Sequence, residues 1–126
     1  MKTSELTGAA LDWAVAKCEG GTNLRYDTVA CWWFTLDGED RVLSRGWSVV
    51  QNFAPSADWA QGGPIIEREN LDVCIHIPTH QWCSATQSSA DRFARGYGPT
   101  PLIAAMRCYV ASKLGDEIGI PRGLTK

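Results

Sequence analysis

The sequence predicts an α+β fold, in which an antiparallel sheet has an N-terminal helix and a C-terminal helix packed on it. Three observations indicate this class: a helical apolar period near the N-terminus, short β-rich runs separated by turn residues in the middle, and a capped helix near the C-terminus. The chain has 126 residues, the usual length of one domain, so we expect residues 1–126 to form a single domain.

Composition and charge restrict the function. Hydrophobic residues make up 44% of the chain, which is ordinary for a globular protein. The net charge is -2 and the basic residues are scattered, so we expect no nucleic-acid partner. The sequence has no secretory signal pattern and no apolar run of the ~18 residues that a membrane helix needs. We therefore expect a cytoplasmic protein without a membrane partner, in which the five cysteines are reduced thiols.

The first helix is predicted from apolar spacing in the N-terminal segment. Thr3 or Ser4 can act as its N-cap, and Gly20 follows its last turn. Asp12 lies off the apolar stripe and is expected to face solvent. The stripe consists of four apolar residues at helical spacing: Leu11, Ala14, Val15 and Cys18.

The middle of the chain predicts strands. Residues 29–36 are rich in β-branched and aromatic side chains, and a turn at 37–40 returns the chain into further short strands up to residue 53. Residues 71–77 alternate between apolar and polar, which predicts a strand with residues 82–86 as its hairpin partner. Residues 87–97 are polar and contain glycine, so we expect a mobile loop there.

The segment between residues 55 and 65 has the most unusual composition. Ser56 can cap a single helical turn, which the Gly-Gly-Pro run at 62–64 is expected to end before one more turn over 65–70. Trp59 could stack on a nucleobase, with Asp58 and Gln61 as hydrogen-bonding groups and the glycines allowing close backbone approach. The alternative is a structural loop that Trp59 plugs from inside.

The C-terminal helix has clear start and stop signals. Thr100 at the cap and Pro101 at the first helical position begin it, and Gly115 ends it. Its free N–H groups and partial positive charge could hold an anion. Arg107 lies two turns further along and could contact a second group beside the helix. The alternative is a capped structural helix with a surface arginine.

Tryptophan is unusually frequent, with six in the chain. Indoles bring a large apolar area, and six exceed what one small core is expected to hide. One or two should therefore lie at a ligand site or an interface. The same surplus of apolar surface leads us to expect a homodimer.

Metal binding and catalysis are weaker alternatives. Four potential zinc ligands lie within ten residues: Cys74, His76, His80 and Cys83. The usual Cys-x2-Cys spacing is missing and the path through Pro78 is awkward, so we expect no metal. Cys83 and Ser84 lie near a histidine, but no strained turn presents them as nucleophiles. We expect no catalytic residues and no cofactor.

Three segments resemble one protein family. They are ELTGAALDWAVAKCEG at 5–20, FAPSADWAQGGPIIERE at 53–69 and GPTPLIAAMRCYVASKLGDE at 98–117. They resemble the NinX family, small proteins of lambdoid phages and their prophages. The resemblance implies an accessory protein that is expressed inside an infected bacterium and dispensable for building virions. The resemblance brings no catalytic assignment with it, and residues 26–46 match the family pattern poorly.

We therefore expect a phage accessory protein that binds and sequesters a small anionic nucleotide-derived host molecule, such as an immune signal, without catalysis. One alternative is an interaction module that inhibits a host defence or regulatory protein through exposed tryptophans. Another is an enzyme that degrades a nucleotide signal. The expected ligand-binding residues are Ser56, Asp58, Trp59, Gln61, Gly62, Gly63, Pro64, Ile65, Thr100, Pro101 and Arg107.

Overall fold

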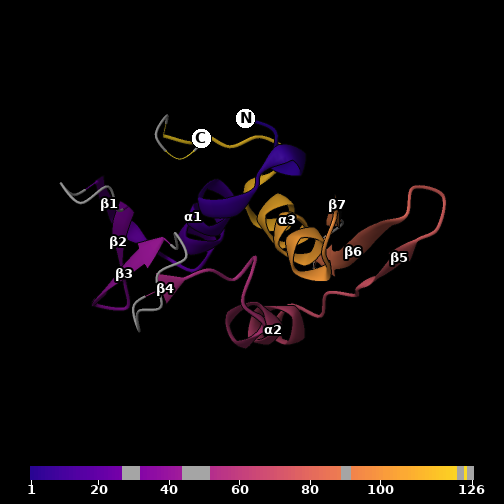
Figure 1. Ribbon diagram of the computed structural model, residues 1–126, viewed down its shortest axis with the longest axis horizontal. Coiled ribbons are helices and arrows are strands. Elements are labelled where there is room, and N and C mark those ends of the chain that lie inside the picture. Colours follow the sequence, from indigo (N-terminus) through magenta and orange to yellow (C-terminus); the bar gives the residue numbers. More distant parts are fainter. Residues whose placement is uncertain (27–31, 44–51, 89–91, 122–123, 125–126) are drawn as a thin grey trace.

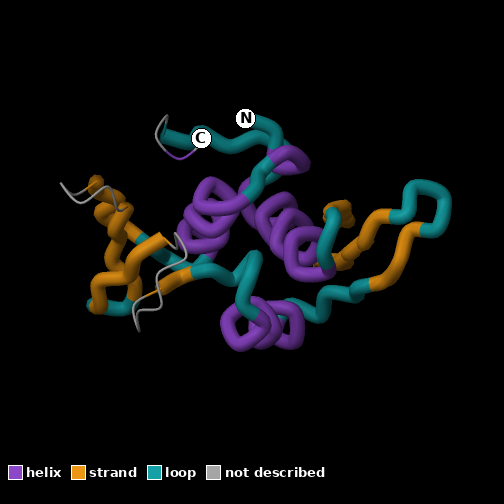
Figure 2. Tube along the Cα trace, viewed as in Figure 1, coloured by secondary structure: helices purple, strands orange, loops and turns teal. Residues whose placement is uncertain are grey.

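A computed structural model of the chain describes residues 1–26, 32–43, 52–88, 92–121 and 124. Two helices, α1 (Gly8–Cys18) and α3 (Pro101–Leu114), lie side by side in the middle of the molecule. Strands gather at either end of the long axis (Figure 1, Figure 2). The predicted α+β class, with its N-terminal and C-terminal helices, is confirmed. The strands form two separate sheets instead of the one expected.

The first sheet has four strands in the order β1-β2-β3-β4. β1 to β3 are antiparallel and β3 pairs with β4 in parallel. The turn predicted at 37–40 is confirmed over Asp37-Gly38, where both residues have positive φ, at 53° and 80°, as a tight hairpin turn needs, while Glu39 and Asp40 already belong to the next strand. Residues 29–31 and 44–51 of the segment predicted to form strands lie outside the described residues. The strands are β1 (Thr22–Tyr26), β2 (Trp32–Leu36), β3 (Glu39–Leu43) and β4 (Asn52–Phe53).

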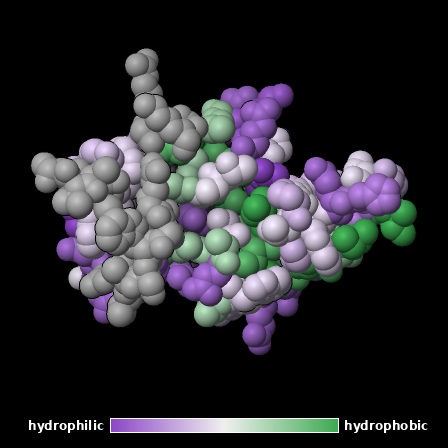
Figure 3. Space-filling view, viewed as in Figure 1, coloured by the Kyte–Doolittle hydropathy of each residue, from purple (hydrophilic) through white to green (hydrophobic). Residues whose placement is uncertain are grey.

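The second sheet has three antiparallel strands in the order β5-β6-β7. They are β5 (Cys74–His76), β6 (Gln81–Ser88) and β7 (Arg92–Gly98). The predicted hairpin between residues 71–77 and 82–86 is confirmed, with a shorter first strand. This hairpin projects from the helices in Figure 1, and Figure 3 shows apolar side chains near its outer end. Ile75 and Ile77 are 47% and 75% exposed.

The mobile loop expected over residues 87–97 is wrong, because β7 occupies most of it. The glycines of this segment serve close packing against α3. A Cβ on Gly96 would lie 2.2 Å from the carbonyl oxygen of Ala104, and one on Gly98 would lie 2.8 Å from Cγ2 of Ile103. Carbon atoms in contact normally stay ~3.5–4.0 Å apart. A strand without side chains at these positions is therefore what lets α3 lie directly on the sheet.

The two predicted terminal helices are confirmed, with one correction. In α3, Thr100 Oγ1 accepts a hydrogen bond from the Ile103 N–H at 3.1 Å, and Pro101 is the first helical residue. In α1, the expected cap at Thr3 or Ser4 is wrong. Those residues belong to a separate 3-10 turn, and α1 begins only at Gly8. Among the described residues, no helix combines the length and the apolar character needed to cross a membrane.

α2 (Trp59–Arg68) is one continuous helix, so the expected break at residues 62–64 is wrong. The reason is again packing. A Cβ on Gly62 would lie 2.4 Å from the carbonyl oxygen of Pro55 and 2.6 Å from Cδ2 of Leu102. Gly62 thus permits contact with the preceding loop and with α3 and does not terminate the helix. Pro64 lies within the helix and is exposed to solvent.

The apolar core joins the helices to the four-stranded sheet. Phe34 is fully buried and makes edge-to-face contacts with Trp13, at a centroid distance of 5.7 Å, and with Phe53, at 5.2 Å. Burial of one such aromatic side chain contributes ~3 kcal/mol or less by area, with more from the ring contacts. The core continues along α3 through Met106, Tyr109 and other residues that are nearly inaccessible to solvent.

A polar cluster ties together the C-terminal ends of the three helices. Arg68 of α2 donates two hydrogen bonds to Glu19, at 2.7 and 3.0 Å, and one to the Tyr109 hydroxyl at 3.1 Å. The Tyr109 hydroxyl itself donates to Glu19, and burial together with this carboxylate raises the pKa of the tyrosine. Lys113 pairs with Glu69 at 3.3 Å. These contacts set the spacing of the helices at that end.

The two ends of the chain pair with each other. The Thr3 N–H donates to the Asp116 carbonyl oxygen at 2.8 Å, and the Thr3 hydroxyl donates to the Gly115 carbonyl oxygen at 2.7 Å. The Ile118 N–H donates to the Met1 carbonyl oxygen at 3.0 Å. These bonds hold the segment after α3 against the N-terminus, in an antiparallel pairing of Lys2 with Glu117.

Candidate functional site

Ser56 joins two of the family-like segments. Its backbone N–H donates to Oδ1 of Asp12 in α1 at 2.9 Å, and both residues are buried. The expectation that Asp12 faces solvent is wrong: it is only 3% exposed. Burial raises the pKa of Asp12 to about 7, although hydrogen bonds from the Ser56 side chain and backbone oppose the shift. Apolar spacing could not reveal this contact, because its partner lies 44 residues away.

Asp58 and Gln61 organise the start of α2. The Asp58 carboxylate caps the helix by accepting from the Ala60 N–H at 3.0 Å. The Gln61 carboxamide accepts from the Ala54 N–H at 2.9 Å and donates to Asn52 O and Asp58 Oδ2, both at 3.1 Å. Both side chains therefore have internal hydrogen-bond partners that hold the loop before α2.

Trp59 lies on the surface at the first position of α2 and is 56% exposed. The prediction that the core does not enclose it is confirmed, and the alternative of an inward-facing plug is wrong. A Cβ on Gly63 would lie 3.9 Å from Cε3 of the indole, which is ordinary van der Waals contact, so the ring does not depend on a glycine there. Ile65, by contrast, is 5% exposed and belongs to the core.

The structure brings α2 and the start of α3 together. Gly62 packs against Leu102 in the first turn of α3, next to Pro101 and Thr100. Thr100 is exposed, and its hydroxyl oxygen already accepts the Ile103 N–H. The predicted Trp59 and Thr100 segments thus belong to neighbouring helices, each closed at its N-terminus by its own capping side chain.

Arg107 lies in a different place, between the N-terminal segment and β7. Its guanidinium donates to the Leu6 carbonyl oxygen at 2.9 Å and to the Tyr97 carbonyl oxygen at 2.7 Å. Burial lowers its pKa from the ordinary arginine value, which still leaves it charged at neutral pH. These two bonds fix the guanidinium in one orientation.

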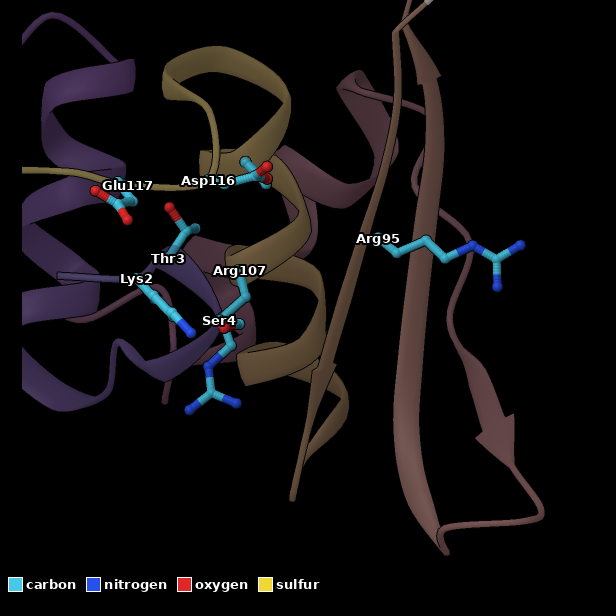
Figure 4. Close-up of a pocket in the computed structure, with 8 residues that line it drawn as sticks. Lys2, Thr3, Ser4, Arg95, Arg107, Asp116 and Glu117 are labelled. Carbon is cyan, nitrogen blue, oxygen red and sulfur yellow. The ribbon is translucent and has the colours of Figure 1, made fainter.

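Arg107 lines a pocket of about 190 Å³. Figure 4 shows the Lys2 amino group and the Arg107 guanidinium directed to one end of the pocket, with Ser4 beside them and the carboxylates of Asp116 and Glu117 at the other end. The Arg95 side chain points away from these residues, so its guanidinium does not take part (Figure 4). The pocket therefore presents cations at one end and carboxylates at the other.

The sequence contained no signal for most of this pocket. Arg107 was among the predicted ligand-binding residues, but Lys2 and Ser4 were not. They reach Arg107 because the N-terminal segment runs along α3, as the bond from Arg107 to Leu6 across 101 residues shows. Such a long-range approach leaves no periodic pattern in the sequence.

A second, more open pocket of about 340 Å³ lies on the four-stranded sheet. Arg25, Tyr26, Trp33 and Asp40 line it. Arg25 and Asp40 form an ion pair at 2.8 Å, so their charges largely satisfy each other.

Metal binding was a weaker alternative from the sequence. The described residues contain no group of three or more His, Cys, Asp or Glu side chains that could hold a metal ion.

The family model described as bacteriophage P22 NinX matches residues 2–113, which is most of the chain. The chain belongs to the NinX family. It is therefore a phage accessory protein, and the matched range includes Lys2, Trp59 and Arg107 but ends before Asp116. No curated protein matches the chain.

Proposed function

We propose that this NinX-family protein binds and sequesters a small anionic nucleotide-derived host molecule, without catalysis. We place the anionic group in the pocket between the N-terminal segment and α3. The observation that carries the proposal is the Lys2 and Arg107 pair at one end of this pocket (Figure 4). A guanidinium that is already oriented by two backbone carbonyls loses little freedom when it binds an anion.

The donors of the pocket suit a phosphate. A guanidinium has five N–H groups, and the two bonds to Leu6 and Tyr97 leave others for a ligand. The Lys2 amino group and the Ser4 hydroxyl supply further donors at the same end. Charge-assisted hydrogen bonds of this kind are about twice as strong as neutral ones.

The carboxylates at the other end favour a nucleotide over a simple anion. Asp116 and Glu117 can accept hydrogen bonds from ribose hydroxyls or from an amino group. The volume of about 190 Å³ is below the ~300–1,000 Å³ of pockets that enclose drug-sized ligands. A phosphate with its ribose is a suitable size, and the base would lie at the mouth.

Binding without reaction is the simpler chemistry for these residues. Among the described residues, no histidine or cysteine lines the pocket, and the Thr3 hydroxyl is engaged with the Gly115 carbonyl oxygen. The lining residues offer cations at one end and carboxylates at the other, which fit a ligand that is held by charge and hydrogen bonds and later released unchanged.

Isothermal titration calorimetry tests the proposal with AMP, ADP-ribose, a cyclic dinucleotide and inorganic phosphate. We expect at least one nucleotide to bind, and Lys2→Ala to weaken its binding about tenfold, as the loss of a charge-assisted contact implies. Lys17→Ala is the matched control, because Lys17 is an exposed cation on α1 outside the pocket, and its affinity should equal that of wild type. Mass spectrometry of the heated complex should recover the ligand intact.

Three results would contradict the proposal in different ways. Binding that survives Lys2→Ala but is lost in Trp59→Ala would place the ligand on the surface of α2. Recovery of a cleaved product would make the protein an enzyme. Failure of every nucleotide to bind would remove the proposal altogether.

A second candidate is an interaction module, and the exposure of Trp59 favours it. A tryptophan that is 56% exposed, beside the exposed Ala60 and Pro64, has the character of an interface residue. The partner would be a host defence or regulatory protein. The same surface could serve the homodimer expected from the sequence, which light scattering on wild type and Trp59→Ala would reveal.

A further inference from the structure

Two cysteines face each other across the β5–β6 hairpin. Cys74 of β5 and Cys83 of β6 are direct partners in the antiparallel register. Neither forms a disulfide in the structure. This pair belongs to neither the anion pocket nor the surface around Trp59, so it is independent of the function proposed above.

The pair lies on the face of the sheet that is turned away from α3. Gly96 packs directly on α3 and pairs with Ser84, so Ser84 is on the helix-facing side. Successive residues of a strand point to opposite faces, which places Cys83 on the outer side together with its partner Cys74. Cys74 is exposed there, whereas Cys83 is 7% exposed.

Backbone geometry at this position permits a disulfide. Directly opposed residues of antiparallel strands have Cα atoms ~4.5–5.5 Å apart, depending on the type of pair. Disulfides span Cα distances of ~4.4–6.8 Å. The bond can therefore form without separating the strands. The neighbouring pair supports the register, because the Asp72 N–H donates to the Ala85 carbonyl oxygen at 3.1 Å and the Ala85 N–H to Asp72 Oδ1 at 2.7 Å.

We propose that Cys74 and Cys83 are a reversible dithiol–disulfide site that exchanges with a small-molecule disulfide of the oxidised-glutathione class. The order of reaction follows from exposure. Cys74 meets the reagent first because it is exposed, and the buried Cys83 then closes the bond from within the hairpin. No third cysteine among the described residues is placed opposite either thiol.

The exchange balances in two steps. The Cys74 thiol first loses its proton to solvent. The resulting thiolate attacks one sulfur of the reagent, forms a mixed disulfide and releases one reagent thiolate. The Cys83 thiolate then attacks the Cys74 sulfur, forms the Cys74–Cys83 bond and releases the second thiolate. The two released thiolates take up the two protons. The protein dithiol is oxidised by two electrons and the reagent is reduced to two thiols.

Electrostatics make the first step slow at neutral pH. The pKa of Cys74 is raised by desolvation first, and then by the neighbouring Cys83 and Asp72, so little thiolate is present. Exchange should speed up as pH rises, because the thiolate is the nucleophile. Oxidation would then lock the base of the hairpin that carries the exposed Ile75 and Ile77.

Peptide mapping gives an unusually clean test. No lysine or arginine lies between residues 69 and 91, so trypsin releases Cys74 and Cys83 in one peptide that contains no other cysteine. Full-length protein is incubated with oxidised glutathione, unfolded, alkylated and digested. We expect this peptide to lose the mass of two hydrogens and to escape alkylation. Dithiothreitol should reverse the change, while the peptides of Cys18, Cys31 and Cys108 remain alkylated.

Three variants sharpen the test. Cys83→Ser should stop at a stable glutathione adduct on Cys74, and Cys74→Ser should form neither adduct nor disulfide. Cys18→Ser is the matched control and should behave as wild type. A persistent adduct on Cys74 in the wild type, a disulfide to another cysteine, or no oxidation of this peptide would overturn the proposal. If Cys83→Ser fails to fold, the peptide map of the wild-type protein still tests the proposal.

Discussion

The two sheets pack against the helices in opposite ways. The four-stranded sheet meets α1 through large rings, with Phe34 held between Trp13 and Phe53. The three-stranded sheet lies close against α3 because Gly96 and Gly98 have no side chains and leave room for the helix backbone. The first interface is filled by large side chains, whereas the second depends on the absence of side chains, which lets strand and helix approach closely. Removal of atoms should therefore damage the first, and addition of atoms should damage the second.

The same difference explains which sheet the sequence revealed. Aromatic and β-branched side chains identified residues 32–36 as strand, because those side chains are themselves the packing surface. The β7 segment packs on α3 through the backbone of its glycines. In a sequence, glycine is equally typical of a turn or a loop, so this strand gives no clear signal. The failed prediction of a loop over residues 87–97 thus comes from the chemistry of the contact.

The largest expected effect is at the aromatic contact. Phe34→Ala should lower the free energy of unfolding by ~3–5 kcal/mol, because it removes a fully buried ring and leaves a cavity between two other rings. Urea denaturation followed by circular dichroism measures the change. Tyr26→Ala is the control on the same sheet, since Tyr26 is 58% exposed, and its loss should stay below about 1 kcal/mol. Equal losses in the two variants would refute the aromatic contact.

The second expected effect is at the glycine contact. Gly96→Ala should destabilise the protein by ~1–3 kcal/mol, because the new Cβ would meet the Ala104 carbonyl oxygen and part β7 from α3. Gly119→Ala is the matched control, as a Cβ there meets nothing within 4 Å, and should change stability by less than ~0.5 kcal/mol. A neutral Gly96→Ala would show that the strand can move away from the helix without loss.

The smallest expected effect concerns the buried carboxyl that links α1 to the loop before α2. The folded-state pKa of Asp12 is raised from 3.8 to about 7, so between these values the folded protein binds more protons than the unfolded chain. This contribution to stability is fully present below pH 3.8 and is lost as pH rises through about 7. As pH rises from 5 to 6, the free energy of unfolding should fall by about 1 kcal/mol because of this group.

Asp12→Asn isolates this contribution. Asparagine keeps an oxygen acceptor for the Ser56 N–H but carries no titratable charge, so the ~1 kcal/mol fall between pH 5 and 6 should disappear. Paired urea denaturations at the two pH values measure it. Glu5→Gln removes the same charge from an exposed residue and controls for net charge. An unchanged pH dependence in Asp12→Asn would assign the slope to other groups.

The sequence by itself determined the features whose signals are local. The Thr100-Pro101 start and Gly115 end of α3 follow from capping chemistry within a few residues, and the Asp37-Gly38 turn follows from the backbone freedom of its residues. The family resemblance belongs here as well, since it was inferred from contiguous segments.

Only the tertiary structure decided the features that depend on distant partners. The burial of Asp12 needs Ser56, the continuity of α2 through Gly62 needs Leu102, and the anion pocket needs Lys2 to lie beside Arg107. Each residue alone has an ordinary local explanation as a surface charge, a helix breaker or a terminal lysine. Long-range packing changes that explanation, because desolvation and steric contact depend on what lies opposite in space and not on what lies next in the chain.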